Sequence, residues 1–420
     1  MAICGIDFGT SNSSVGILRQ GQVFVVPLDN GSTSSPSAMF FRPDGATLFG
    51  TAAVDAYTQG EAGRFMRALK SMLGHKALAT STLINRKRVR FSDIIGHYLR
   101  YLKQAAEEAA GEAVTSVVLG RPVFYVDNDA EADRLAEDTM ATIARQAGFT
   151  DVTFAYEPVA AAHAHADSGD SDVKDADLIL VVDLGGGTAD FSLLRKGAGG
   201  DMRQPEILGS DGVHIGGTDL DYRVNVDFFM PLMGYGGSMN DTFRTKVLPI
   251  PQWYFQDLAT WQRIPFMYEP KIRTELREIR TLAQEPDKID RIIEILDERL
   301  GHRLAGDAEA AKIALSHAQS TRTVFDYVED GLAVDVARAD YEATIDPQIT
   351  RIVAASQRLL ATIGEKAERV DAILMTGGTS QVPQIQRQFA KAYPNADLLM
   401  EDLFATVCTG LTRLAATRFA

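Results

Sequence analysis

The stretch Val182-Asp183-Leu184-Gly185-Gly186-Gly187-Thr188-Ala189-Asp190 decides the fold of this chain, because a stretch near its start has the same plan. That earlier stretch is Ile6-Asp7-Phe8-Gly9-Thr10-Ser11-Asn12-Ser13. In both, an apolar strand ends in Asp, a turn of small residues follows, and a second apolar strand leads away. Small residues let backbone N–H groups approach a phosphate closely, and a strand-end Asp can hold a hydrated divalent cation. Two such hairpins, 176 positions apart (183 − 7), predict a duplicated fold that holds a nucleotide between its halves.

The composition is that of a globular protein with more than one domain. A length of 420 residues exceeds one ordinary core, and 45% hydrophobic with 23% charged residues is typical of soluble domains. The net charge of −14 argues against a duplex nucleic-acid partner. No apolar run is long enough to span a membrane. With only Cys4 and Cys408, which we expect to be small core residues, a cytoplasmic protein is predicted.

Strand and helix patterns repeat in the two halves. In the first half we expect strands at about 2–7, 13–19 and 22–27, a helix at 92–110, a strand at 116–120, a helix at 129–147, a strand at 152–155 and a helix from 158. In the second half we expect strands at 178–183, 190–195 and 205–213, a helix from 217, a helix at 347–364, a strand at 371–376, a helix from 383, a strand at 397–400 and a helix at 402–418. The repeat predicts two α/β lobes, each with a mixed five-stranded sheet flanked by helices.

The predicted lobes are residues 1–170 and 171–420, with the boundary in a polar, acidic loop. Two stretches, about 36–90 and 231–335, do not fit the repeat and are predicted to be inserted subdomains. The second contains an aromatic and proline-rich piece at 249–261, which forms either a small private core or a partner-binding surface.

At this point the chain resembles the ATPase domain of DnaK-type (heat-shock-70 family) chaperones, within the actin/sugar-kinase/chaperone superfamily. The likeness is greatest to the short YegD-like members and covers nearly the whole chain. Besides the two hairpins, four motifs stand in the family's order: Leu69–Gly74, Tyr156–Ala162, Glu309–Ser316 and Met375–Pro383. The resemblance implies two duplicated actin-like (ribonuclease H-like) lobes with Mg²⁺ and ATP or ADP as cofactors.

The resemblance also implies roles for the two hairpins. Asp7, Asp183 and Asp190 would surround the magnesium ion, mostly through water, because Mg²⁺ gives up its hydration shell reluctantly. The residues implied to face the β- and γ-phosphates are Gly9, Thr10, Ser11 and Asn12 from one side and Gly185, Gly186, Gly187 and Thr188 from the other.

Two further residues are implied to act in hydrolysis. Lys70 would orient the attacking water and counter charge on the γ-phosphate. Glu157, beside Pro158 at a helix start, would position water or the metal shell. Together with Asp183 and Thr188 they form the predicted catalytic set. The alternatives from residue type alone are an exposed helix lysine and a surface glutamate before a helix.

The nucleoside is expected against one helix face and one glycine turn. Positions i, i+3 and i+7 share a helix face, and the implied contacts are Glu309, Lys312, Ser316, Gly377, Gly378 and Thr379. Gly216 and Gly217 are implied near the γ-phosphate. Ile313 stands where chaperones usually have an arginine.

Three departures from the family pattern stand out. Gly120-Arg121-Pro122-Val123 replaces the usual Val-Pro-Ala, and Arg121 is expected at the phosphates, at the lobe interface or in solvent. Phe404 stands where the family has an Asp. The chain ends at Ala420, so neither the family's apolar linker nor its peptide-gripping β-sandwich is expected.

We therefore predict an ATP-binding, slowly ATP-hydrolysing protein of the chaperone branch, whose lobes close on the nucleotide and act on an unidentified protein partner or co-chaperone. Three alternatives stay open. They are a nucleotide switch or scaffold that does not hydrolyse ATP, a filament-forming actin-like protein, and a small-molecule kinase, which needs a base for the acceptor hydroxyl.

Overall fold

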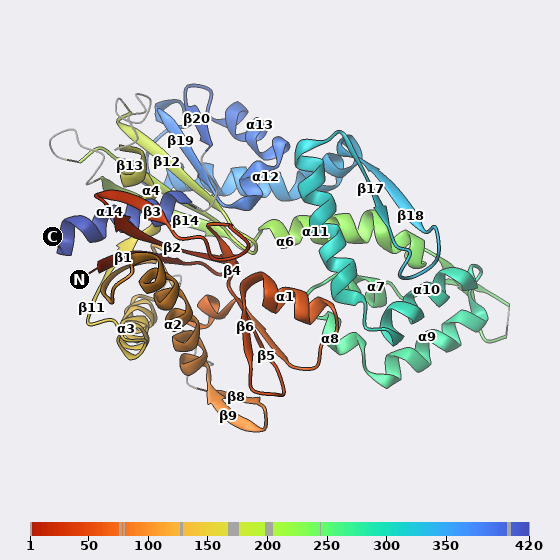
Figure 1. Ribbon diagram of the computed structural model, residues 1–420. Coiled ribbons are helices and arrows are strands. Elements are labelled where there is room, and N and C mark those ends of the chain that lie inside the picture. Colours follow the sequence, from red (N-terminus) through yellow and green to blue (C-terminus); the bar gives the residue numbers. More distant parts are fainter. Residues whose placement is uncertain are drawn as a thin grey trace.

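The computed structural model describes residues 2–74, 78, 80–126, 129–166, 176–197, 205–243, 245–400 and 405–419. Two mixed sheets with the same topology lie in the left half of Figure 1. The first has the order β11-β10-β1-β2-β3, with β4 paired to β2. Its strands are β1 (Ala2–Phe8), β2 (Asn12–Arg19), β3 (Gln22–Val25), β4 (Ser35–Pro36), β10 (Val114–Arg121) and β11 (Asp151–Tyr156).

The second sheet has the order β14-β13-β12-β19-β20. Its strands are β12 (Leu178–Leu184), β13 (Ala189–Arg195), β14 (Glu206–Val213), β19 (Ala372–Thr376) and β20 (Asp397–Met400). In the first sheet β1 pairs antiparallel with β2 and parallel with β10, and β10 pairs parallel with β11. In the second sheet β12 pairs in the same way with β13 and β19, and β19 pairs parallel with β20. The predicted duplication is therefore confirmed in topology as well as in element order.

The strand registers place the aspartates of the two hairpins at corresponding positions in the two sheets. Asp7 lies opposite Ser14 in one hairpin and Asp183 lies opposite Asp190 in the other. The apolar run Leu178–Val182 is buried on both faces, as expected for a strand covered by helices on either side. Each aspartate therefore ends a buried strand.

Two helices cross between the sheets, side by side in Figure 1: α4 (Glu157–Ala166) and α14 (Ala405–Phe419). Ala161 and Ala162 of α4 pack against the second sheet, while α14 packs on β1 and β10 of the first. A Cβ atom at Gly410 would clash with the backbone of Ala160. The small residues of the Tyr156–Ala162 motif thus allow the close approach of two helix backbones.

Further amphipathic helices pack around the two sheets (Figure 1). Ile94, Ile95 and Leu99 belong to the first core, and Phe389 packs on Phe191 in the second. The helices are α2 (Phe91–Ala110) and α3 (Ala130–Gln146) on the first lobe, and α6 (Gly217–Val224), α12 (Arg338–Ile363) and α13 (Pro383–Ala392) on the second.

Two inserts extend from the sheets, at the lower centre and the right of Figure 1. The first insert contains β5 (Ala38–Phe41), β6 (Thr47–Phe49), α1 (Gly50–Thr58), β7 (Arg64–Arg67), η1 (Leu69–Met72), β8 (Ser81–Ile84) and β9 (Lys87–Arg90). The second insert contains η3 (Asn225–Phe229), η4 (Met230–Met233), β15 (Ser238–Asn240), β16 (Val247–Pro249), α7 (Trp253–Leu258), α8 (Ile264–Met267), α9 (Pro270–Leu282), α10 (Pro286–Asp297), α11 (Gly301–His317), β17 (Ser320–Val324) and β18 (Ala333–Ala337).

The aromatic piece at 249–261 contributes to the core of the second lobe. Ile250, Tyr254, Phe255 and Leu258 are buried in the same cluster as the second sheet, so this core is continuous with the lobe rather than private.

Most predicted elements match the structure, including Cys4 and Cys408 as buried, unpaired core residues. The helix predicted at 347–364 is longer and begins at Arg338, with Pro347 inside it. Proline is common at the first turn of a helix, but Pro347 lies inside α12. Of the boundary loop predicted at 167–177, residues 167–175 lie outside the described residues. No helix in the described ranges is long and apolar enough to cross a membrane.

Candidate nucleotide site

The turns of the two hairpins meet between the sheets. A Cβ atom at Gly186 would clash with the Ser11 hydroxyl, so residues from opposite halves of the chain are in direct contact there. The first turn is braced by Ser37, whose hydroxyl donates to Gly9 O at 2.7 Å and whose backbone N–H donates to Ser11 O. The sequence prediction did not include Ser37, which lies outside every motif.

The second turn is braced by the start of α6. The backbone N–H and the hydroxyl of Thr218 both donate to Gly186 O, at 2.7 and 2.8 Å. A Cβ atom at Gly216 would lie 2.5 Å from Gly187 N. Thr188 donates to Asp190 at 2.8 Å. The structure therefore brings Gly216 and Gly217 against the second turn.

Lys70 and Glu157 form an ion pair beside the hairpins. Lys70 Nζ lies 2.6 Å from Glu157 Oε1, and the side chains are only 9% and 15% exposed. Lys70 belongs to the first insert and Glu157 begins α4, where the helix N-terminus favours a negative charge. Lys70 is thus not an exposed helix lysine, and Glu157 is not a surface residue.

This ion pair belongs to a larger group of coupled charges. The pKa of Asp7 is raised to about 7, mainly by desolvation and also by Glu157 and Asp183, while Lys70 lowers it. Desolvation likewise raises the pKa of Asp183 to about 6, helped by Asp190 and Glu157 and opposed by a hydrogen bond from Thr376.

The same carboxylates keep Lys70 charged. Burial alone lowers the pKa of Lys70, but Glu157, Asp7 and Tyr125 raise it above its usual range. The hairpin aspartates and the ion pair therefore share one electrostatic environment that Lys70 only partly neutralises.

The donor chemistry of this cluster fits a hydrated Mg²⁺ ion. Carboxylates whose pKa is raised by burial and by one another are stabilised by a nearby cation. Among the described residues no group of three acidic, histidine or cysteine side chains is close enough to ligate one ion directly. Asp7, Asp183 and Asp190 therefore fit an ion held mainly through its water shell.

Of the predicted residues on α11, Lys312 lies near the second turn. Lys312 is buried and lies 2.7 Å from Asp221. A Cβ atom at Gly217 would lie 3.2 Å from Lys312 Nζ and 2.7 Å from the Thr379 hydroxyl, which donates to Gly185 O. Lys312, Gly217 and Thr379 are therefore neighbours.

Several of the other residues predicted to contact the nucleoside are more exposed to solvent than Lys312. Glu309 and Gly378 are exposed, and Ile313 is 53% exposed. Ser316 donates to Lys312 O within its own helix. Gly377 has φ +80°, a left-handed conformation that favours glycine.

Asp221 is a site residue that the sequence prediction missed. Burial raises its pKa to about 6, although Lys312 lowers it. Its signal was weak, because only the fold brings α6 beside α11. Phe404, where the family has an Asp, lies outside the described residues.

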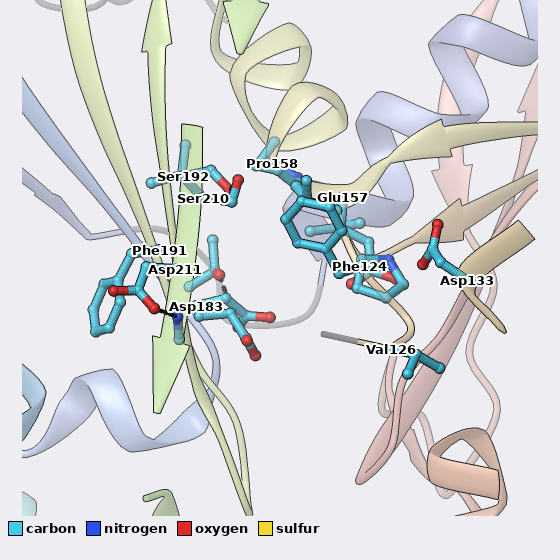
Figure 2. A pocket seen from close by; sticks show the side chains of 18 of the residues that line it. Phe124, Val126, Asp133, Glu157, Pro158, Asp183, Phe191, Ser192, Ser210 and Asp211 are labelled. Carbon is cyan, nitrogen blue, oxygen red and sulfur yellow. Dashed lines mark hydrogen bonds between the residues drawn. The ribbon is translucent and has the colours of Figure 1, made fainter. Parts of the chain in front are cut away.

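A cavity of about 630 Å³ reaches the carboxylates from the side of β13 and β14. Figure 2 shows Asp183, Ser192, Ser210 and Asp211 on one side of it, and Glu157, Phe124 and Asp133 on the other. We call it the interlobe cavity. Its other charged lining residues are Asp129 and Asp190.

With this geometry established, comparison with known families identifies the chain. A model described as Hsp70 protein matches residues 3–91, 75–236 and 277–398. The chain belongs to the Hsp70 family. Family membership confirms the resemblance to the heat-shock-70 ATPase domain and the duplicated actin-like fold. It also assigns the chain, in general terms, to the nucleotide-binding ATPases of the chaperone family. The YegD-like likeness stays a prediction.

The matched residues leave out 237–276 of this Hsp70-family chain. That stretch holds β15, β16, α7 and α8, with both tryptophans, Trp253 and Trp261. The stretch between matched regions that the family model leaves out therefore lies within the second insert.

Proposed function

We propose that this Hsp70-family chain binds Mg-ATP between its two sheets and hydrolyses it slowly to ADP and phosphate. The observation that carries the proposal is the Lys70–Glu157 ion pair of 2.6 Å, held in one charge cluster with Asp7 and Asp183. A fixed cation and a fixed hydrogen-bond acceptor beside the phosphate turns suit attack by water on the γ-phosphate.

In this proposal the catalytic residues act by positioning and charge. Lys70 stabilises negative charge on the γ-phosphate oxygens and donates to the attacking water, while Glu157 accepts a hydrogen bond and fixes its orientation. The water oxygen bonds to the γ-phosphorus as the bond to the ADP oxygen breaks, and the water's proton passes to phosphate or solvent. Mg²⁺, when bound, neutralises phosphate charge; Asp7, Asp183 and Asp190 would hold its water shell.

The turns and α11 supply the remaining contacts in the proposal. The backbone N–H groups of the two hairpin turns cradle the β- and γ-phosphates, with Thr188 and Gly216–Gly217 beside them. Glu309, Lys312 and Ser316 face the adenosine from one side and Gly377–Thr379 from the other. Ile313 offers the base an apolar contact.

Lobe closure is proposed as the physical output, and a contact between the inserts supports it. Tyr57 Oη lies 2.9 Å from His302 Nε2, although the two residues are 245 positions apart. The Trp261 ring packs edge-on against His302 at 4.8 Å, and Arg67 lies over Trp261 at 5.2 Å. We name Tyr57, Arg67, Trp261 and His302 the insert clasp. Nucleotide would shift the population between clasped and open states.

The lobe division proposed is 1–170 and 171–420, with the two inserts at about 36–90 and 231–335. A protein partner or co-chaperone would respond to the closure. A cytoplasmic location is part of the proposal, supported by two buried cysteines that are unpaired.

A small-molecule kinase is the second candidate, because the interlobe cavity adjoins the same carboxylates. A hydroxyl acceptor bound there would need one of them as a base. ADP formation that depends on an added acceptor would favour this function over hydrolysis. A nucleotide switch that does not hydrolyse ATP is the remaining alternative.

The decisive experiment is single-turnover hydrolysis of Mg-ATP by the purified chain without peptide, with bound nucleotide quantified in parallel. Slow conversion to bound ADP is expected. Tight binding of ATP without conversion would refute hydrolysis and favour the switch.

A further inference from the structure

The guanidinium of Arg121 is buried at the edge of the site. Arg121 is 7% exposed. It is the last residue of β10 and pairs with Tyr156 of β11. Of the three places expected for Arg121 from sequence, solvent is therefore ruled out.

The Arg121 guanidinium forms hydrogen bonds to groups on two segments. Its Nε donates to Pro122 O at 3.0 Å and its Nη2 to Val123 O at 3.1 Å. From α3, Asp133 accepts from Nη2 at 2.8 Å and Glu137 accepts from Nη1. Asp133 also accepts from the Tyr125 backbone N–H at 2.6 Å. The chain from 122 to 125 is thus wrapped around one guanidinium and tied to α3.

Two tyrosine rings enclose the same guanidinium. Its central carbon lies 5.1 Å from the ring centre of Tyr125 and 5.1 Å from that of Tyr156. A planar guanidinium can stack on aromatic rings while its edge forms hydrogen bonds, which a lysine ammonium cannot do.

Each tyrosine is connected to one member of the Lys70–Glu157 pair. Tyr156 immediately precedes Glu157 in the chain. Tyr125 is among the groups that raise the pKa of Lys70, and Lys70 and Glu157 in turn affect the pKa of Tyr125. Gly120, the residue before Arg121, leaves room for Glu157, since a Cβ there would lie 3.2 Å from Glu157 Cγ.

We propose that Arg121 is a positioning residue that fixes the Lys70–Glu157 ion pair by holding Tyr125 and Tyr156 on either side of its guanidinium. This inference rests on the proposed function in giving that pair a role in hydrolysis. The pair's geometry, however, can be measured without any turnover. Gly120 and Arg121 act together, because the glycine admits the Glu157 side chain and the arginine orders the segments around it.

The first test measures how well Lys70 is protected from chemical labelling. The full chain is labelled briefly with an amine-reactive reagent, and each lysine is quantified by peptide mass spectrometry. Lys103 and Lys312 serve as internal references, because both are paired and similarly buried, at 14% and 11% side-chain exposure. In Arg121→Met, labelling of Lys70 should rise several-fold while the references stay unchanged.

Further variants separate positioning from general loss of stability. Arg121→Lys keeps a positive charge but not the stacking, so it should give only partial protection of Lys70. Tyr156→Ala removes one ring at a position already 38% exposed, and it should also increase Lys70 labelling if Arg121→Met does not fold. Arg418→Met is the matched control, because Arg418 bonds to β11 at Phe154 O but does not stack on either tyrosine.

Unchanged Lys70 labelling in both Arg121→Met and Tyr156→Ala would overturn the inference, as would an equal rise at all three lysines. If the wild-type chain hydrolyses ATP, Arg121→Met should lower the single-turnover rate about tenfold with ADP affinity retained. A wild-type chain without turnover would refute the proposed function alone, since the labelling result would still decide the role of Arg121.

Discussion

At the scale of single residues, the site depends on a lysine that lies far from its partners in sequence. Lys70 and Glu157 are 87 positions apart, yet they form an ion pair that is mostly removed from water. Breaking such a pair leaves the other charge buried and uncompensated. Substitutions here therefore change both the charge balance and the geometry of the cluster.

Lys70→Ala should abolish turnover while leaving ADP affinity nearly intact. Lys70 is proposed to act on the γ-phosphate, which ADP lacks, so the loss should appear in the chemical step. We expect the single-turnover rate to fall about 100-fold or more, as when one preorganised charge donor is removed. Lys103→Ala, which removes a lysine paired on α2, is the control. An unchanged rate would remove Lys70 from the mechanism.

Asp183→Asn should weaken the Mg²⁺-dependent part of ATP binding. The amide keeps the size of the side chain and can still accept from Thr376, which lies 3.0 Å from Asp183, but it lacks the charge that holds a hydrated cation. The measurement is ATP affinity with Mg²⁺ and with EDTA. If the ratio of the two affinities equals that of the wild type, the proposed water shell is wrong.

At the scale of elements, the crossing of α4 and α14 depends on backbones that touch. Gly410→Ala would place a methyl group against Ala160 O, and we expect a loss of about 1–3 kcal/mol in the free energy of unfolding. Gly306→Ala in α11 is the matched control, because no atom lies within 4 Å of a Cβ there. This second change should stabilise the protein by about 0.5–1 kcal/mol. Urea unfolding of both variants measures the difference, and equal effects would contradict the close crossing.

The elements were largely predictable from sequence, and specific side-chain contacts were not. Buried strands such as Leu178–Leu184 and the repeated Asp–Gly–Thr turns carry local signals, so their order and pairing could be inferred. The contacts of Arg121 and Asp221 could not be predicted from sequence, because their charged partners come from α3 and α11. The start of α12 differs from the prediction: the helix begins at Arg338 and contains Pro347, a residue type that is common in first turns.

At the scale of the whole molecule, the insert clasp connects the two inserts, which are far apart in sequence and extend from different sheets. The Tyr57 ring stacks on Phe65 at 4.3 Å within the first insert, while its hydroxyl meets His302 of the second. Opening the two inserts must break this hydrogen bond and separate Trp261 from Arg67. The clasp should therefore slow the release of a nucleotide bound beneath it.

Tyr57→Phe should release ADP faster, because it removes the hydrogen bond and keeps the stacked ring. A net loss of about 1 kcal/mol corresponds to roughly a fivefold faster release. Displacement of a fluorescent ADP analogue gives the rate. Tyr327→Phe is the control, since Tyr327 bonds to Asp307 within the second insert. Equal release rates in Tyr57→Phe and wild type would mean that the clasp does not limit exit.

The clasp should also make stability depend on pH through His302. Burial lowers the pKa of His302 to about 4, slightly opposed by the backbone of Trp261, whereas an unfolded histidine titrates near 6.5. The folded state therefore favours the neutral ring. Its contribution to stability is complete above about pH 6.5 and is lost as the pH falls toward 4.

Asp7, Asp183 and Asp221 act in the opposite direction, because their raised pKa values favour the folded state as they gain protons. The pH profile of the wild type alone is consequently a sum of opposing effects, and a comparison with His302→Gln isolates the histidine. Between pH 7 and pH 5 the wild type should lose about 2 kcal/mol relative to His302→Gln in urea unfolding. Parallel profiles of the two proteins would show that the imidazole stays accessible to protons, and that the inserts open well before the chain unfolds.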